Sequence, residues 1–236
     1  VKLSLGIVDG RNIWKNDFKK SLELIQKATD ALGHDRILIA PSCSLIHSPC
    51  DLDLETNDAV LTPEIKQWLA FAKQKLDEIV LLQNLALEEI SQVDSVSFLQ
   101  NTLANENRKT SKLIHNEEVK YRVASIKCGD DQRENAFNIR RKKQIEALQL
   151  PLFPTTTIGS FPQTNEVRSW RAKFKKGELS AQEYNDLLER ETTATIRFQE
   201  EIDIDVLVHG EFERNDMVEY FGEKLDGFSF TKNGWV

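Results

Sequence analysis

Apolar and polar positions in the first part of the chain follow the pattern of strands separated by helices. The apolar run Leu3–Val8 predicts a short strand, and residues 37–40 predict a second buried strand. Between them, apolar residues recur at helical spacing over residues 18–28, and Asn16 or Asp17 can cap the start of this helix. These forty residues therefore predict a strand, a helix and a strand, the unit of parallel sheets.

A longer helix is predicted after Thr62 and Pro63, which form a favourable pair of cap and first-turn residues. Apolar residues recur at helical spacing over residues 65–80, so we expect one long amphipathic helix packed on a sheet or barrel. Asparagine and lysine interrupt the pattern over residues 93–150, where a second, charged helix is predicted from about Asp131 to Leu148. This stretch is typical of a linker with helices of its own.

The second half repeats the order of strand, helix and strand. Prolines stop helix formation after residue 150, and residues 155–161 then predict a strand. Ser180 and Glu183 predict a capping box at the start of a helix, and residues 205–208 predict the next strand. From this pattern, doubly wound sheets and (β/α)₈ barrels remain equally open.

Composition and charge exclude several classes of protein. A net charge of −7 and a pI near 5.3 argue against nucleic acid as a partner, because phosphate binding needs a concentrated basic face. No apolar run of membrane-spanning length and no signal peptide is evident, so we expect no membrane association and a cytoplasmic location. The three cysteines fit reduced thiols better than a disulfide framework.

The first candidate site lies at the end of the strand predicted over residues 155–161. In a barrel the active site is at the carboxyl ends of the strands, where Ile158, Gly159 and Ser160 would lie. Gly159 allows a ligand to approach the backbone, and the amides and the Ser160 hydroxyl can donate hydrogen bonds to a carboxylate. A tight turn without a ligand is an equally acceptable interpretation.

Glu211 follows the next strand and would face the same region. A carboxylate at a barrel mouth needs a cationic partner, and the α-ammonium group of an amino acid would serve. The alternative is a structural salt bridge to Arg214 or Arg168. Because strand side chains alternate, His209 should point to the same side as Glu211 but deeper, so we expect a hydrogen-bonded core histidine there.

Cys43, His47 and Cys50 have a spacing that superficially resembles a zinc site. Three ligands on one loop would be unusual, and only Asp51 is close enough in sequence to act as a fourth ligand. We therefore predict no metal site in this segment.

Long stretches of the chain resemble the cobalamin-independent methionine synthase family. They include GIVDGRNIW, APSCSLIHSPCDL, TIGSFPQT, VLVHGE and RNDMVEYFGE. Members of that family are much longer, and this chain begins with valine, so we expect a segment of a longer protein. The resemblance implies an α/β fold with parts of two (β/α)₈ TIM barrels joined by a helical linker. Residues 1–92 would be the C-terminal part of the N-terminal barrel, 93–150 the helical interdomain linker, and 151–236 the N-terminal part of the C-terminal catalytic barrel.

The resemblance also implies an activity, a methyltransferase reaction of methionine biosynthesis. The methyl group of 5-methyltetrahydropteroyltri-L-glutamate, a polyglutamyl folate, would pass to L-homocysteine and give L-methionine, with zinc held by residues outside this segment. Ile158, Gly159, Ser160 and Glu211 would bind homocysteine or methionine, and no catalytic residue is predicted here. We expect the piece to be inactive without the remaining parts of its two barrels.

Two other functions remain as alternatives. The chain could be a helical interaction module in which residues 62–150 bind a partner and no amino-acid pocket exists. It could also be a related zinc-dependent methyltransferase or a barrel decarboxylase, but the N-terminal barrel segment argues against both.

Overall fold

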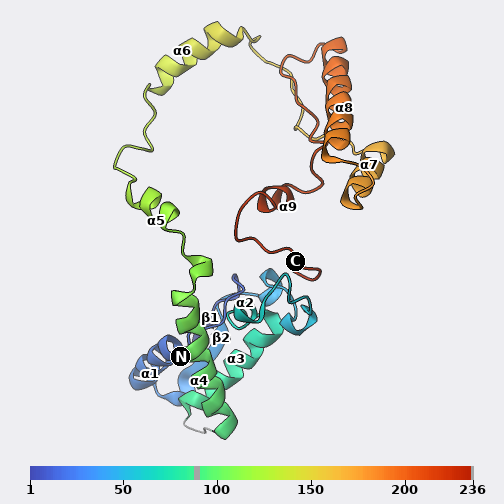
Figure 1. The fold of residues 1–236 in the computed structure, drawn as a ribbon. Coiled ribbons are helices and arrows are strands. Elements are labelled where there is room, and N and C mark those ends of the chain that lie inside the picture. Colours follow the sequence, from blue (N-terminus) through green and yellow to red (C-terminus); the bar gives the residue numbers. More distant parts are fainter. Residues whose placement is uncertain (88–90, 235–236) are drawn as a thin grey trace. The chain divides into compact units, whose positions relative to one another are not determined.

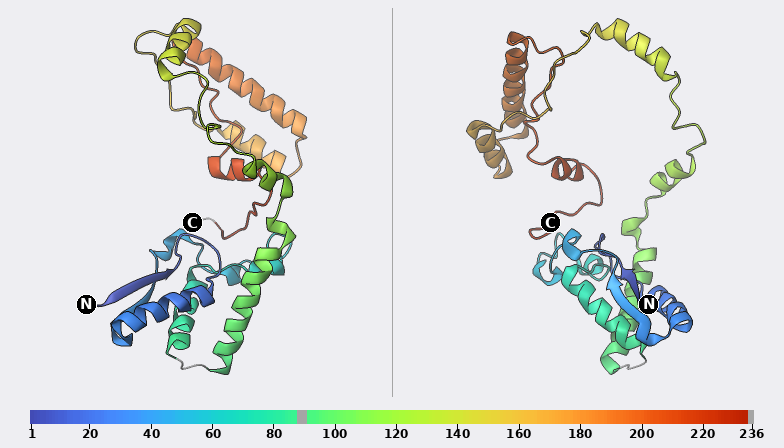
Figure 2. Two further views of the ribbon diagram at one scale, coloured as in Figure 1. Left: turned by 90° about the vertical axis from the view of Figure 1, so that its left-hand side faces the viewer. Right: turned by 180° about the vertical axis from the view of Figure 1, so that it is seen from behind.

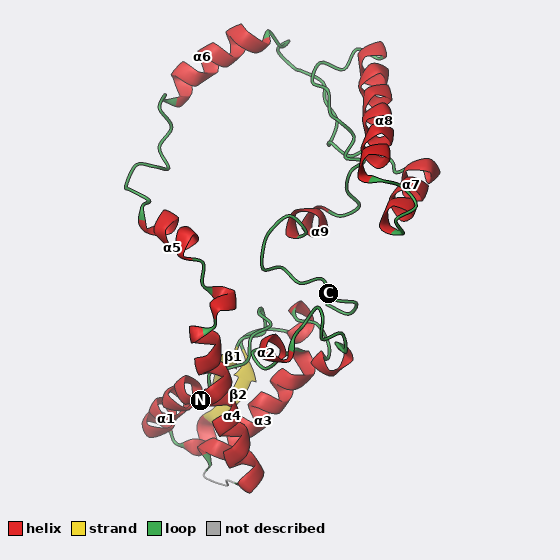
Figure 3. Cartoon of the chain, in the orientation of Figure 1, coloured by secondary structure: helices red, strands yellow, loops and turns green. Residues whose placement is uncertain are grey.

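A computed structural model describes residues 1–87 and 91–234, and divides them into two compact units (Figure 1). Unit 1 contains Val1–Ser125 and the described residues from Asp226 on; unit 2 is Ile126–Leu225. Each unit is described by itself. Helices and strands both occur, so the α/β class is confirmed at this level (Figure 3).

Unit 1 begins with the predicted strand, helix and strand. Strands β1 (Leu3–Val8) and β2 (Ile37–Pro41) pair in parallel, and helix α1 (Phe18–Leu32) connects them. The Asp17 side chain caps α1 by accepting a hydrogen bond from the Lys20 amide. The local pattern therefore predicted this strand, helix and strand correctly.

Helices α3 (Ala72–Ala86) and α4 (Gln92–Thr110) complete the core of unit 1 (Figure 2). Helix α1 packs against α3, α4 and both strands, and α3 also contacts β2. The centre of this core consists of buried side chains from β1, α1 and α3, namely Val8, Phe18, Ile25 and Leu82. Burial of these side chains is the main source of stability for the sheet, because an isolated two-stranded pair is marginal in water.

The single long helix predicted over residues 63–80 is wrong. Helix α2 (Pro63–Lys66) ends after one turn, and α3 starts only at Ala72. The intervening chain pairs instead with residues 13–15: the Lys15 amide donates to the Trp68 carbonyl oxygen at 2.7 Å, and the Ala70 amide donates to the Ile13 carbonyl oxygen at 2.9 Å. Trp68, Leu69 and Phe71 are buried in this non-helical segment. The helical spacing of apolar residues could not predict this, because the partners are distant in sequence.

The chain between α4 and the second half contains two separated helices. Helix α5 (Glu117–Ala124) belongs to unit 1 and α6 (Phe137–Leu148) to unit 2. Helix α6 starts later than the predicted Asp131, because residues 127–132 form turns through backbone bonds such as Gln132 N–H to the Gly129 oxygen. Short 3₁₀ helices occur at His34–Arg36, Leu45–His47, Leu52–Leu54 and Lys112–Ile114.

Unit 2 also contains three helices near its candidate site. They are α7 (Asn165–Lys175), α8 (Ala181–Glu201) and α9 (Met217–Gly222). The predicted capping box is present, because the Ser180 hydroxyl accepts from the Glu183 amide while the Glu183 carboxylate accepts from the Ser180 amide. The two predicted strands occur only as isolated parallel bridges, Thr156 with Val206 and Ser160 with Gly210. In the described residues no further bridge extends this pairing, and the Val208 backbone instead exchanges two hydrogen bonds with the Gln199 side chain of α8.

Candidate functional site

The candidate site of unit 2 lies where the two bridged segments end. Asp205 joins them, since its carboxylate accepts from the Thr155 amide at 2.7 Å and from the Thr155 hydroxyl at 2.8 Å. These hydrogen bonds hold the pKa of Asp205 below its usual value. At the other end, the Phe161 amide donates to the Gly210 carbonyl oxygen at 2.9 Å. These hydrogen bonds bring Ser160, which follows Gly159, close to Glu211, which follows Gly210.

Three residues at this point have backbone conformations in the left-handed region. Gly159 has φ +111°, Gly210 has φ +89° and Glu211 has φ +60°. A Cβ atom added at Gly159 would lie 2.9 Å from the Glu211 Oε1, so the carboxylate lies directly against the Gly159 backbone. At Gly210 an added Cβ would meet the Phe212 ring at 2.5 Å. Glycine is therefore needed at both positions for two reasons: a Cβ atom would collide with a neighbouring side chain, and the positive φ disfavours other residues.

Glu211 forms an ion pair with Arg214 in this structure. The Arg214 guanidinium contacts the Glu211 Oε1 through one nitrogen and the Glu213 Oε1 through the other, each at 2.5 Å. Of the two salt-bridge partners considered from the sequence, Arg214 is the one present. Within the described residues, Oε2 of Glu211 accepts no hydrogen bond, and the Glu211 side chain is 27% exposed.

The other predicted residues lie at the surface of the same strand ends. The Ile158 side chain is 94% exposed, and Ser160 is exposed while its backbone pairs with Gly210. The expectation of a core histidine at His209 is wrong: its side chain is 56% exposed, and its Nδ1 accepts from the Glu211 amide.

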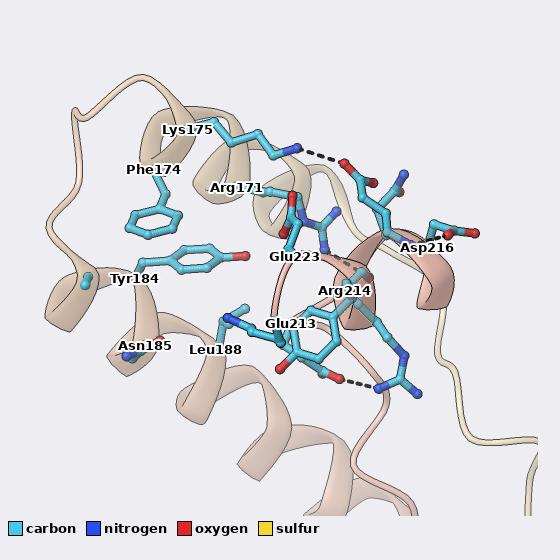
Figure 4. Close-up of a pocket in the computed structure, with 15 residues that line it drawn as sticks. Arg171, Phe174, Lys175, Tyr184, Asn185, Leu188, Glu213, Arg214, Asp216 and Glu223 are labelled. Carbon is cyan, nitrogen blue, oxygen red and sulfur yellow. Dashed lines mark hydrogen bonds and ion pairs between the residues drawn. The ribbon is translucent and has the colours of Figure 1, made fainter. Parts of the chain in front are cut away.

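A cavity of about 490 Å³ lies beside this site, between α7, α8 and α9 (Figure 4). Its lining combines stacked aromatic rings, Phe174 and Tyr184 with centroids 4.6 Å apart, with groups of both charges. The pair of Glu213 and Arg214 lies on the wall nearest the candidate site. Arg214 lines the cavity and forms an ion pair with Glu211, so the cavity lies next to the candidate site.

Unit 1 has a separate polar cluster at the end of β1. The Lys75 ammonium is almost fully buried and donates to the Asn12 Oδ1 at 3.3 Å and to the Trp14 carbonyl oxygen at 3.1 Å. The Glu78 Oε1 accepts from the Asn16 amide at 2.8 Å, whereas its buried Oε2 has no partner among the described residues. Burial lowers the pKa of Lys75 and raises that of Glu78 to about 7. The cluster ties the loop after β1 to α3.

Comparison with known proteins shows what the chain is similar to. Residues 153–236 match the family described as cobalamin-independent synthase, catalytic domain. Over its whole length the chain is 76% identical to a protein of Flavobacterium johnsoniae named 5-methyltetrahydropteroyltriglutamate--homocysteine methyltransferase. The chain is thus similar to a segment of the cobalamin-independent methionine synthases. The resemblance drawn from the sequence is confirmed.

Two further family members carry the same name. Over 99% of the chain, the identity is 58% to the protein of Cytophaga hutchinsonii and 53% to that of Saccharomyces cerevisiae. The chain spans only 30% of the length of each of these three relatives. The match to a catalytic-domain family over residues 153–236 covers the whole candidate site of unit 2.

Sequence reasoning missed two residues that hold the site. Gln163 and Arg171 hydrogen-bond to the backbone of the turn that carries Glu211. Gln163 lies within the TIGSFPQT run, but only the folded chain shows what its amide contacts. Arg171 lies on α7, where exposed arginines are common, so no sequence signal distinguished it from Arg168.

The three residues of the superficial zinc motif do not converge on a common point. Cys43 donates weakly to the Ser44 carbonyl oxygen at 3.6 Å, His47 ends a 3₁₀ turn, and Cys50 is exposed. Within residues 1–87 and 91–234, no three His, Cys, Asp or Glu side chains are grouped so that they could hold a metal ion. In that same part of the chain, no helix has the length and apolarity to cross a membrane.

Proposed function

We propose that this chain is part of an enzyme that transfers the methyl group of 5-methyltetrahydropteroyltri-L-glutamate to L-homocysteine and yields L-methionine. The observation that carries the proposal is the position of the Glu211 carboxylate against Gly159 at the ends of two parallel-bridged segments. The names of the three relatives support it. The match to a catalytic-domain family argues against the helical interaction module.

The site residues have positioning roles in this proposal. The backbone amides around Ile158 and Gly159 and the Ser160 hydroxyl donate hydrogen bonds to the α-carboxylate of homocysteine. The Glu211 carboxylate accepts from its α-ammonium group, which adds a second cation beside Arg214. Binding both ends of the amino-acid group fixes the direction in which the thiol points, and this orientation lowers the entropic part of the barrier. None of these groups activates the thiol.

The proposal includes two incomplete (β/α)₈ barrels. Residues 1–92 form the C-terminal part of the first barrel, 93–150 the helical linker, and 151–236 the N-terminal part of the catalytic barrel. Exposed apolar side chains support this proposal, because the missing parts of a barrel would cover them. Examples are Leu38 of β2, which is 51% exposed, and Leu76 of α3, which is 55% exposed. The remaining parts of both barrels are then the principal partners of this segment.

Zinc dependence belongs to the proposal for the full-length enzyme. The described residues do not fit a zinc site, because they contain no group of three potential ligands. The ligands would therefore come from the part of the relatives that this chain does not span. A cytoplasmic location is proposed as well, in keeping with the free cysteines.

Glu211→Gln in the full-length enzyme tests the site, with Glu213→Gln as the matched control. Both carboxylates pair with Arg214, but only Glu211 contacts Gly159. Loss of a charge-assisted hydrogen bond should weaken homocysteine binding by about 1.5 to 3 kcal/mol, roughly 10- to 150-fold, for Glu211→Gln alone. Calorimetric titration gives the affinity and thermal unfolding gives the stability. Equal losses of stability in both variants with unchanged affinity would show that Glu211 only anchors Arg214.

A further inference from the structure

The turn from Gly210 to Arg214 is held from one side by two side chains of the preceding segment. The Gln163 Nε2 donates to the carbonyl oxygens of Glu211 at 3.3 Å and of Arg214 at 3.2 Å. One guanidinium nitrogen of Arg171 donates to the carbonyl oxygens of Phe212 at 2.8 Å and of Arg214 at 3.3 Å. Three carbonyl groups of one short turn thus accept hydrogen bonds from these two side chains, and the Glu211 carbonyl oxygen also accepts from the Arg214 amide at 3.4 Å.

The two side chains are themselves joined. The same Arg171 nitrogen donates to the Gln163 Oε1 at 2.8 Å, so the carboxamide accepts from the arginine while it donates to the turn. This arrangement fixes which end of the Gln163 amide faces the backbone. It also makes the orientation of Gln163 depend on Arg171, which projects from α7 toward the turn (Figure 4).

The turn needs such support because its backbone is unfavourable for an ordinary residue. Glu211 has φ +60°, a region that side chains other than glycine seldom adopt. Phe212, which is only 2% exposed, packs its ring against Gly210 and anchors the turn on its inner side. Without the hydrogen bonds to its carbonyls, Glu211 would relax to a common conformation and its carboxylate would leave Gly159.

We propose that Gln163 and Arg171 are positioning residues for the amino-acid site: they clamp the carbonyls of residues 211, 212 and 214 and so hold the Glu211 carboxylate over Gly159. Arg214 transmits part of the effect, because the clamp fixes its backbone while its guanidinium holds the Glu211 Oε1. Neither clamp residue contacts the substrate. The inference rests on the proposed role of Glu211 in binding the homocysteine ammonium group.

The test uses Gln163→Met and Arg171→Met in the full-length enzyme. Both remove the hydrogen-bond donors; methionine keeps the length of the glutamine side chain and is shorter than the arginine side chain. Each should weaken homocysteine binding at least fivefold and leave the KM for the methyl donor within twofold. Matched controls are Gln182→Met on α8, whose amide contacts only the exposed Asp186, and Arg168→Met, an exposed residue of α7. Both controls should bind homocysteine as the unchanged enzyme does.

A double variant that combines Gln163→Met with Glu211→Gln distinguishes a positioning role of Gln163 from a general effect on stability. If the clamp acts through Glu211, Gln163→Met should have less than a twofold effect on homocysteine binding once Glu211 is already Gln. An undiminished effect in that background would overturn the inference, as would unchanged binding in the Gln163→Met single variant. A loss of melting temperature with equal losses in every kinetic constant would show a merely structural role. Gln163→Met decides the matter even where Arg171→Met does not fold.

The same set of variants distinguishes failure of the inference from failure of the proposed function. If Glu211→Gln leaves homocysteine affinity unchanged, the amino-acid site is wrongly assigned and the clamp falls with it. If Glu211→Gln weakens affinity while Gln163→Met and Arg171→Met do not, only the clamp is refuted.

Discussion

Replacement of Glu78 by glutamine should remove a pH dependence of stability that is built into unit 1. The Glu78 side chain is buried, its Oε1 accepts from the Asn16 amide, and its Oε2 has no partner among the described residues. Burial raises its pKa from the ordinary 4.5 to about 7, although the positive charges of Lys75 and Lys15 act in the opposite direction. Glutamine keeps the acceptor for the Asn16 amide and carries no charge.

The magnitude follows from the shift in pKa. A rise of about 2.5 corresponds to about 3 kcal/mol, because one pKa unit is worth about 1.4 kcal/mol. In the folded state Glu78 binds its proton more tightly than in the unfolded state. The stabilising contribution is therefore complete below pH 4.5 and is lost as the pH rises through about 7. The Gln variant should match the natural protein near pH 4.5 and exceed its stability by about 3 kcal/mol at pH 8.

Urea unfolding at a series of pH values measures this difference in the full-length protein. A brief hydrogen-exchange pulse at one common pH, read from peptides of α3, reports the unfolding of unit 1 separately. Asp77→Asn, which removes an exposed carboxylate from the same helix, is the control and should retain most of the pH dependence. Parallel stability curves for the natural protein and Glu78→Gln would refute the reasoning. A less stable Gln variant at pH 8 would show that attraction to the lysines outweighs burial.

Two further predictions concern packing and the backbone. Leu82→Ala in the core of unit 1 should cost about 2 to 5 kcal/mol in urea unfolding, whereas Gln83→Ala, at an exposed polar position of the same helix, should change stability by less than about 0.5 kcal/mol; equal costs would contradict the assigned core. Gly159→Ala should weaken homocysteine binding about tenfold, because its methyl group would displace the Glu211 carboxylate. Gly177→Ala, also at positive φ but with open space around it, should cost only about 1 kcal/mol of stability and leave homocysteine binding unchanged, and comparable binding losses in both variants would argue against the close contact.

The sequence by itself determined the elements whose causes are local. The apolar run of β1, the Asp17 cap of α1 and the reciprocal Ser180 and Glu183 cap of α8 each depend on neighbours within a few residues. Such hydrogen bonds and periodicities can be read in order along the chain. The long motif runs likewise sufficed to identify the family, and they placed Gly159 and Glu211 among the candidate site residues.

Only the tertiary structure decided the features that depend on distant partners. The helix predicted beyond Lys66 breaks because the backbone around Trp68 pairs with Ile13 and Lys15, more than fifty positions earlier. The raised pKa of Glu78 arises from burial under several elements, and no local pattern carries that information.

The candidate site follows the same division. The sequence supplied residue types suited to an amino acid. The left-handed backbone of Glu211 and its contact with Gly159, however, belong to a turn that accepts hydrogen bonds from Gln163 and Arg171, 48 and 41 positions earlier. Hydrogen bonds from side chains to distant carbonyls follow no periodic rule, because any donor of suitable length can make them. The chemistry available to the site was therefore visible in the sequence, whereas its geometry emerged only from the folded chain.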